Sequence, residues 1–177
     1  MTHSLVVLLS VWNLFGLLPG DKVELRDLAC TYQDRSLVVH CRLAGVDGTV
    51  LRQALESGET VLFDYQVELR RERDIWFDEF VEEYHYQKKL SFDTLTRQYF
   101  ATSEVGSARS EAIIMDDPEK AVGWLSTLDR WVIPALLEGK DEKTYVRSRV
   151  VLRRRKLLLV IPFETSTPWQ RTPVAFP

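Results

Sequence analysis

A two-residue alternation starting at Thr60 constrains the fold of this chain more than any other feature. Apolar side chains occupy the odd positions of this segment, Val61, Phe63, Tyr65, Val67 and Leu69, while the even positions are mostly polar or charged. This period predicts a β-strand with one face in the core and one face in water. We therefore expect Glu68, Arg70 and Glu72 to be solvated and to pair with neighbouring strands at little gain in stability.

The next forty residues continue the strand pattern. From Trp76 to Phe92, aromatic and apolar residues fall mainly on even positions, with Phe77 and Val81 breaking the pattern, so one long twisted or bulged strand is expected. A polar corner at residues 91–94 and a returning strand through residues 95–104 would complete a meander. Sheet packing then explains most of the aromatic residues, in preference to a ligand-stacking platform.

The segment 23–43 predicts a hairpin that turns at residues 34–36. It carries both cysteines of the chain, Cys30 and Cys41, on the faces expected to point into the core. The strand register would decide whether they form a disulfide, and the sequence leaves both states open. Charged residues between the apolar N-terminal run and Cys30 argue against a lipid-attachment cysteine.

Two short helices are expected. The first covers residues 46–55, with Asp47 as its N-cap and Gly58 as its terminator. The second begins at Asp117-Pro118-Glu119 and places Trp124 on one face with Ala121, Leu125 and Leu128, which predicts that Trp124 anchors this helix on the sheet.

The remaining segments predict a loop at residues 132–143, a strand at residues 145–152 and a closing strand at residues 156–163 that is interrupted by Pro162. Taken together, the elements predict a mainly β fold at the margin of α+β: an antiparallel β-sandwich with two short helices. Residues 21–177 would form this single domain, with an irregular tail from about residue 162.

The first twenty residues contain no Lys, Arg, Asp or Glu. Their apolar run, Leu5 to Leu18, is shorter than the roughly 20 residues of a membrane-spanning helix and resembles the hydrophobic part of a secretory signal. This predicts a periplasmic protein, or one anchored in the membrane and facing the periplasm. Because the segment lacks a basic start and an Ala-x-Ala site, cleavage stays open, and the alternative is a buried first strand or helix.

The usual catalytic motifs are missing from the sequence. Its three histidines, His3, His40 and His85, belong to no zinc motif and no Gly-x-Ser-x-Gly nucleophile motif is present, so neither a metal site nor a catalytic triad is expected. An acidic pair that could hydrolyse sugars is a minor alternative, among Asp74, Asp78, Glu79, Glu82 and Glu83. No Gly-rich phosphate loop occurs either, so we expect a protein that is not an enzyme and needs no cofactor.

Residues 55–100 also resemble a known family. The features are a helix ending in Ser57-Gly58, an alternating strand, an Arg-x-Arg near Trp76, and the element "FDTLTRQY", in which Phe92 stands where tyrosine is usual. Together with "DDPEKAVGWLSTLDRWVI" and "TYVRSRVVLRRRKL", they make the chain similar from Val23 to Leu159 to the bacterial family catalogued as domain of unknown function 4390. The resemblance implies an exported envelope protein and carries over no catalytic residue.

The strongest local charge features are basic, although the net charge is −3. We expect them to form an interaction surface, because Arg pairs well with carboxylate and phosphate groups; it comprises Arg70, Arg71, Arg73, Arg147, Arg149, Arg153, Arg154, Arg155 and Lys156. The partner would be an envelope protein, or an anionic phospholipid headgroup, and not nucleic acid.

The sequence thus predicts a non-enzymatic interaction or assembly factor of the envelope that acts through charged sheet faces. The alternative is a β-sandwich module that binds a sugar or a lipid. An open groove lined by Trp76, Tyr84 and Tyr99 would favour that alternative.

Overall fold

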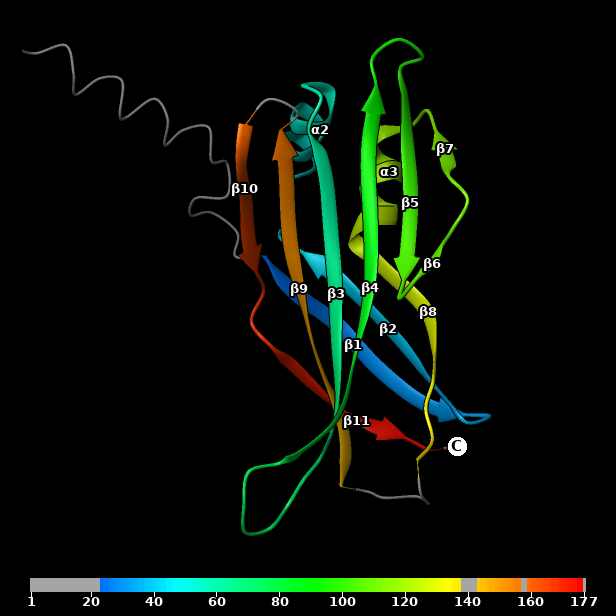
Figure 1. Ribbon diagram of the computed structural model, residues 1–177, viewed down its shortest axis with the longest axis vertical. Coiled ribbons are helices and arrows are strands. Elements are labelled where there is room, and N and C mark those ends of the chain that lie inside the picture. The colour runs from blue at the N-terminus through cyan, green and yellow to red at the C-terminus, as the bar shows by residue number, and fades with distance from the viewer. Residues whose placement is uncertain (1–22, 138–142, 157–158, 177) are drawn as a thin grey trace, which may run out of the picture.

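The computed structural model describes residues 23–137, 143–156 and 159–176 (Figure 1). The segment predicted to be a signal or anchor therefore lies outside the described residues. The strands, in chain order, are β1 (Glu24–Gln33), β2 (Ser36–Ala44), β3 (Thr60–Arg71), β4 (Glu79–Asp93), β5 (Gln98–Val105), β6 (Ala108–Arg109), β7 (Ile113–Met115), β8 (Thr127–Pro134), β9 (Thr144–Lys156), β10 (Leu159–Ser166) and β11 (Gln170–Ala175). The helices are α2 (Gly48–Glu56) and α3 (Pro118–Ser126).

All strands belong to one curled sheet with the order β6-β5-β4-β3-β9-β11-β1-β2-β8, to which β10 and β7 are added beside β9 and β5. Figure 1 shows β1, β2 and β8 crossing behind β3, β4 and β9, so two layers face each other. Strand β11 joins the layers, antiparallel to β9 and parallel to β1. The mainly β fold with two short helices is confirmed; the sheet is mixed and continuous, like a half-barrel, because of this one parallel pairing.

The core lies between the two layers. The odd residues of β3, which the alternation predicted to be buried, are at most 1% exposed, and Leu37, Val39 and Cys41 of β2 face them. Both helices lie toward one end of the molecule (Figure 1), and their buried side chains, chiefly Leu55 and Leu125, belong to the same core.

Local sequence signals explain most of the element boundaries. Asp47 and Asp117 accept hydrogen bonds from the first backbone N–H groups of α2 and α3, as expected of N-caps. The β1–β2 turn uses Asp34 and Arg35 in the left-handed region, with φ of 50° and 59°. The predicted irregularity of β4 is a bulge at Val81, where the pairing with β3 shifts between Leu69 and Arg70.

Four expectations are corrected. Strand β4 begins at Glu79, and residues 72–78 form a long connection instead of strand. The second helix ends at Ser126, and the chain continues directly into β8, most of which had been assigned to the helix or the following loop. Residues 162–175 are not an irregular tail: they complete β10 and form β11, because both can pair with the long strand β9.

The fourth correction concerns the second face of β3. Asp64, Gln66 and Glu68 were expected in water, yet they are 2%, 6% and 7% exposed. Strands β4 and β9 flank β3 on both sides, and long side chains from β9 lie across it. A central strand with such neighbours is buried on both faces despite its alternating sequence.

Candidate functional site

Glu68 is the centre of a charged cluster on the outer face of β3. Its carboxylate accepts hydrogen bonds from Nε and Nη2 of Arg147 at 2.8 and 2.9 Å and from Nε of Arg70 at 2.7 Å. Burial opposes ionisation, but the hydrogen bonds and positive charges of Arg147 and Arg70 prevail and hold the pKa of Glu68 below its ordinary value. The register explains this contact, since Glu68 and Arg147 are directly paired across β3 and β9.

Trp169 covers the neighbouring arginines. Its ring lies 4.4 Å from the Arg147 guanidinium carbon and 4.6 Å from that of Arg149. Arg149 also donates from Nε to the side-chain oxygen of Gln66 at 2.7 Å. The guanidinium groups of Arg147 and Arg149 are therefore both engaged by stacking and hydrogen bonds within the molecule.

A second polar cluster surrounds Asp64 further along β3. His85 Nδ1 lies 3.1 Å from Asp64 and its Nε2 lies 3.4 Å from Glu83, while Arg153 is 3.9 Å from Asp64 and donates to Glu164 at 2.8 Å. His85 is therefore bracketed by two carboxylates. Within the described residues no hydroxyl or thiol is recorded against its ring, so the arrangement offers no nucleophile of the triad type.

The predicted basic surface is thus divided. Arg147, Arg149 and Arg153 share one face of β9, as the alternation indicated, and all three have partners inside the molecule. Arg70, Arg71 and Arg73 lie at the start of the β3–β4 connection. Arg154, Arg155 and Lys156 belong to β9 by their backbone, and their side chains lie outside the described part of the structure.

The β3–β4 connection carries three consecutive large apolar side chains that are exposed. Ile75, Trp76 and Phe77, which we name the hairpin tip, are 86%, 77% and 97% exposed. In Figure 1 this connection protrudes beyond the sheet, at the end opposite to the helices. Phe80 and Val81, at the start of β4, are also exposed and extend the apolar surface toward the sheet.

Paired charges surround the base of the hairpin tip, and we name them the collar. Arg73 pairs with Glu79 at 2.8 Å, Lys143 with Asp74 at 2.7 Å and Arg171 with Glu72 at 3.1 Å. The Tyr145 hydroxyl donates to Asp78 at 2.5 Å, and this hydrogen bond holds the pKa of Asp78 below its ordinary value. With Arg71, which lies 3.8 Å from Glu79, the collar has four cations and four carboxylates and is electrically balanced.

Lys88 is a buried cation on the inner face of β4. Its ammonium donates to the carbonyl oxygens of Trp124 at 2.8 Å and Thr127 at 2.5 Å, and it lies 4.6 Å from the centre of the Trp124 ring. Burial lowers the pKa of Lys88 to about 8. Since carbonyl groups at a helix C-terminus attract positive charge, Lys88 caps α3 from the neighbouring sheet.

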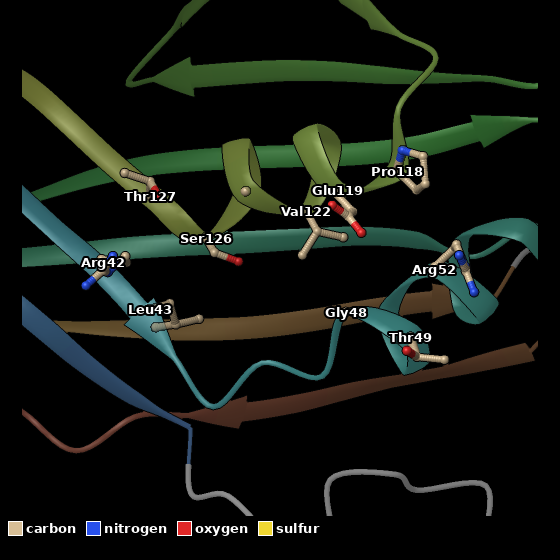
Figure 2. Close-up of a pocket in the computed structure, with 11 residues that line it drawn as sticks. Arg42, Leu43, Gly48, Thr49, Arg52, Pro118, Glu119, Val122, Ser126 and Thr127 are labelled. Atoms are coloured by element: carbon tan, nitrogen blue, oxygen red, sulfur yellow. The ribbon is translucent and has the colours of Figure 1, made fainter.

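A groove of about 420 Å³ separates α2 from α3 (Figure 2). Leu43 and Val122 give it apolar walls, and the hydroxyl of Ser126, which lines it, is buried and has no hydrogen-bond partner among the described residues. Figure 2 places Arg42 near one end and Arg52 near the other. Arg42 is already paired with Asp27 at 2.8 Å, so the groove is only weakly cationic.

The three aromatic residues whose position would favour ligand binding do not share a groove. Trp76 is in the hairpin tip, Tyr99 is 2% exposed with its hydroxyl toward Glu56 of α2, and Tyr84 is half-buried on β4 with its hydroxyl donating to Glu82 at 2.6 Å. They are therefore dispersed over the molecule.

The cysteines are buried free thiols in the structure. Cys30 lies opposite Val39, and burial raises the pKa of both thiols to about 12. Such thiols are poor nucleophiles at neutral pH. Among the described residues no cluster of His, Cys, Asp and Glu could hold a metal ion, and no helix there is long and apolar enough to cross a membrane.

The sequence interpretation missed two features, although a signal for each was present. Three consecutive apolar residues at 75–77 break the alternation, which indicates a loop that exposes them, but they were read as part of a strand. Lys88 lies between Tyr86 and Leu90 on the core-facing positions of β4, where the alternation leads one to expect an apolar side chain. An apolar run after charged residues and a charge on a core face are both departures that call for a specific explanation.

Comparison with known proteins gives a family and no relative of known activity. No curated protein and no solved structure matches the chain. A family model described as "Domain of unknown function (DUF4390)" matches residues 20–170, which includes β1 to β9, both helices, β10 and the start of β11. The resemblance found in the sequence is thereby confirmed, and the chain belongs to the DUF4390 family.

Proposed function

We propose that the protein is a non-enzymatic interaction protein of the bacterial cell envelope, exported by means of residues 1–20, and that it docks through the hairpin tip. The observation that carries this proposal is the exposure of Ile75, Trp76 and Phe77, three consecutive large apolar residues on a protruding connection. Exposed apolar surface of this kind marks an interaction site in a folded protein. Trp and Phe are also prominent among residues that supply binding energy at interfaces.

The proposal changes the part played by the arginines. Arg71 and Arg73 stay in the contact region because they flank the hairpin tip in sequence and their pairing with Glu79 is partly exposed, whereas Arg70 is held by Glu68. Arg147, Arg149 and Arg153 already have intramolecular partners, and recruiting them would require breaking hydrogen bonds such as that between Arg147 and Glu68. The apolar tip is therefore the primary contact and the flanking arginines assist it.

The absence of substrate turnover is part of the proposal. The candidate acids have structural partners: Asp74 pairs with Lys143, Asp78 accepts from Tyr145 and Glu79 pairs with Arg73. His85 lies between two carboxylates. These contacts give each group a structural reason to be there, without a catalytic role.

Crosslinking in intact cells tests the docking site. A photoreactive amino acid replaces Phe77 in one variant and Leu95 in the control; Leu95 is 93% exposed and lies in the connection after β4, at the far end of the same strand. We expect adducts to envelope protein or lipid from position 77 and none from position 95. Equal labelling at both positions, or no adduct at position 77, would contradict docking through the tip.

Fractionation tests the proposed export. The charge-free segment before Asp21 should deliver the protein to the periplasm or its membrane face. A soluble cytosolic protein that retains residues 1–20 would contradict this part of the proposal.

A second candidate function is the binding of a small amphipathic carboxylate in the groove between α2 and α3. The buried, unpaired hydroxyl of Ser126 favours it, because a buried donor without a partner is costly and a ligand oxygen would satisfy it. The only oxygens of dodecanoate are in its carboxylate, so this group would lie at Ser126 and its chain against Leu43 and Val122.

Titration with dodecanoate tests this candidate. Gly123 lines the groove, and a Cβ added there meets no atom within 4 Å, so Gly123→Leu is a variant that adds apolar volume at the groove wall. Binding that Gly123→Leu abolishes, with the melting temperature unchanged, would support the groove as a site. Binding that is unaffected by this substitution would place the fatty acid elsewhere.

A further inference from the structure

From the geometry of the hairpin tip we infer that its docking partner is a lipid bilayer, into whose interfacial region Trp76 and Phe77 insert. This inference rests on the proposed function and specifies the partner. The exposed fractions of 86%, 77% and 97% mean that the described part of the chain covers almost no side of these three side chains. A protein partner would need a deep cavity to enclose the hairpin tip. Lipid chains are fluid and can surround an inserted side chain without a preformed cavity.

The residue types agree with a bilayer interface. Trp is enriched at the boundary between headgroups and acyl chains, where its ring is in an apolar environment and its N–H can still reach polar groups. Phe77 and Ile75 have no polar group, so a deeper position costs them nothing. Phe80 and Val81 would meet the headgroup region next, because they are exposed at the start of β4.

The collar fits the headgroup level. Each carboxylate of the collar has a cation or the Tyr145 hydroxyl as a partner, and its four cations balance its four carboxylates. A balanced collar is not repelled by an anionic lipid surface and does not depend on one. Arg71, Arg73 and Lys143 can extend their long side chains toward phosphates while their stems remain beside the apolar tip.

Insertion by this mechanism is apolar in origin, which separates it from binding through arginine pairs. The fraction bound to vesicles should therefore change little between neutral phosphatidylcholine and vesicles that contain phosphatidylglycerol, and little between low and high salt. Binding through arginine pairs alone would instead be lost in high salt and on neutral lipid.

Quenching by brominated lipid measures the insertion of Trp76 directly. The full chain is combined with vesicles of brominated phosphatidylcholine, and its fluorescence is compared with that of Trp76→Phe, so that the difference reports on Trp76 and the other four tryptophans cancel. We expect this difference to be quenched by bromolipid and protected from aqueous iodide. The comparison remains valid if residues 1–20 also bind the bilayer, because both chains contain them.

Moving the reporter to the other end of β4 provides a matched control. Leu95→Trp in the Trp76→Phe background places a tryptophan at a position that is 93% exposed, and its emission should be quenched by iodide and not by bromolipid. Replacing Ile75, Trp76 and Phe77 together by serine should reduce insertion of this end by more than tenfold, since each large apolar side chain accounts for about tenfold or more in partitioning.

The outcomes distinguish the lipid inference from the proposed function. If Trp76 remains open to iodide and unquenched by bromolipid while position 77 gives protein adducts in cells, docking through the tip stands and the lipid inference is wrong. If Trp76 is not quenched by bromolipid and position 77 is crosslinked to no partner, both are wrong. Equal bromolipid quenching at positions 76 and 95 would also overturn the inference, because it would show that both ends of β4 contact the lipid and that the hairpin tip is not the inserting end.

Discussion

Glu68 shows how one carboxylate keeps two arginines in place. The exposed fractions of its side chain and those of Arg147 and Arg70 are 10%, 30% and 21%. If the charge on Glu68 were lost, the two guanidinium groups would remain beside each other without compensation, in a site largely shielded from water. This cluster therefore stabilises the β3–β9 pairing more than a surface ion pair could.

Glu68→Gln should lower the free energy of unfolding by about 1 to 3 kcal/mol, below the cost of breaking a fully buried pair because Arg147 is partly solvated. The control is Glu24→Gln, whose partner Arg26 is exposed, and its cost should stay below about 1 kcal/mol. Urea unfolding at pH 7 measures both. Equal costs would mean that the Glu68 cluster is no more than a surface pair.

The stability difference between the parent and Glu68→Gln should also depend on pH. Because the folded-state pKa of Glu68 lies below its ordinary value of 4.5, its stabilisation is fully present above that value and is lost as the pH falls through the folded-state pKa. The stability difference between the parent and Glu68→Gln should therefore be constant from pH 5 to 7 and shrink on further acidification. A difference that grows in acid would contradict this account.

Lys88 gives a pH dependence of the same sign, but for a different reason, because burial disfavours its charged form. Its pKa is about 8 in the folded protein and 10.5 ordinarily, so between these values the unfolded chain holds the proton more tightly and stability rises with pH. The parent should gain up to about 3 kcal/mol relative to Lys88→Met between pH 8 and pH 10.5. Lys89→Met, on the exposed neighbouring residue, should show no comparable change, and if it did, the effect would not arise from burial of Lys88.

The side chain that anchors α3 in the core is not the one expected from the sequence. Trp124 was expected to anchor α3, yet it is only partly buried and lies against Lys88, whereas Leu125 and Ala121 are fully buried. Neighbouring residues of an α-helix point about 100° apart around its axis, so Trp124 and Leu125 do not both point into the core. Leu125 is therefore the anchor, and Trp124 covers the capping lysine.

Leu125→Ala should destabilise the protein by about 2 to 5 kcal/mol, because it leaves a cavity in the core. Trp124→Ala should cost about 1 to 3 kcal/mol, since part of its ring is already in water. Chemical unfolding of the two variants gives the order. A larger loss of stability for Trp124→Ala than for Leu125→Ala would mean that Trp124 is the anchor of α3 after all, as the sequence predicts.

Periodicity and capping residues predicted the elements that they control. The β1–β2 hairpin, the N-caps Asp47 and Asp117, the buried odd face of β3 and the bulge in β4 all follow from short-range patterns. Strand β8 was missed because it follows α3 without a turn residue, and the helical spacing continued through Leu128. The burial of Asp64 and Glu68 depends on which strands flank β3, and a local pattern does not contain that information.

The candidate contact surface, too, could be predicted from the sequence only where a local property marks it. Arg70, Arg71 and Arg73 could be found from the sequence because charge density is a local property. That Arg147 and Arg149 are occupied by Glu68, Gln66 and Trp169 could not, since these contacts join residues 20 to more than 80 positions apart. Three consecutive apolar residues mark the hairpin tip in the sequence, but whether a distant element covers it is not a local property, and among the described residues none does.

The whole molecule depends on its C-terminal strand, because β11 is the member of the sheet that connects β9 with β1. Phe176, just after it, packs edge-on against Tyr32 of β1 at 5.7 Å between ring centres. Without β11, the layers would meet only through side chains, and each would have an open edge.

A chain that ends at Trp169 should therefore lose cooperative unfolding and show amide exchange in β1 and β9 that is at least tenfold faster. A chain that lacks only residue 177 is the control and should match the parent. Cooperative unfolding with unchanged exchange in the chain ending at Trp169 would show that the core holds the layers together without β11.

The position of β11 also governs the timing of assembly. The residues that join the two layers lie far along the chain from β1 and β2, so they are synthesised long after β1 and β2 can form their hairpin. Until then the hairpin of β1 and β2 and the meander of β3 to β5 can each form locally but cannot close on one another. Closure of the two layers is therefore a late folding step that waits for the synthesis of β11.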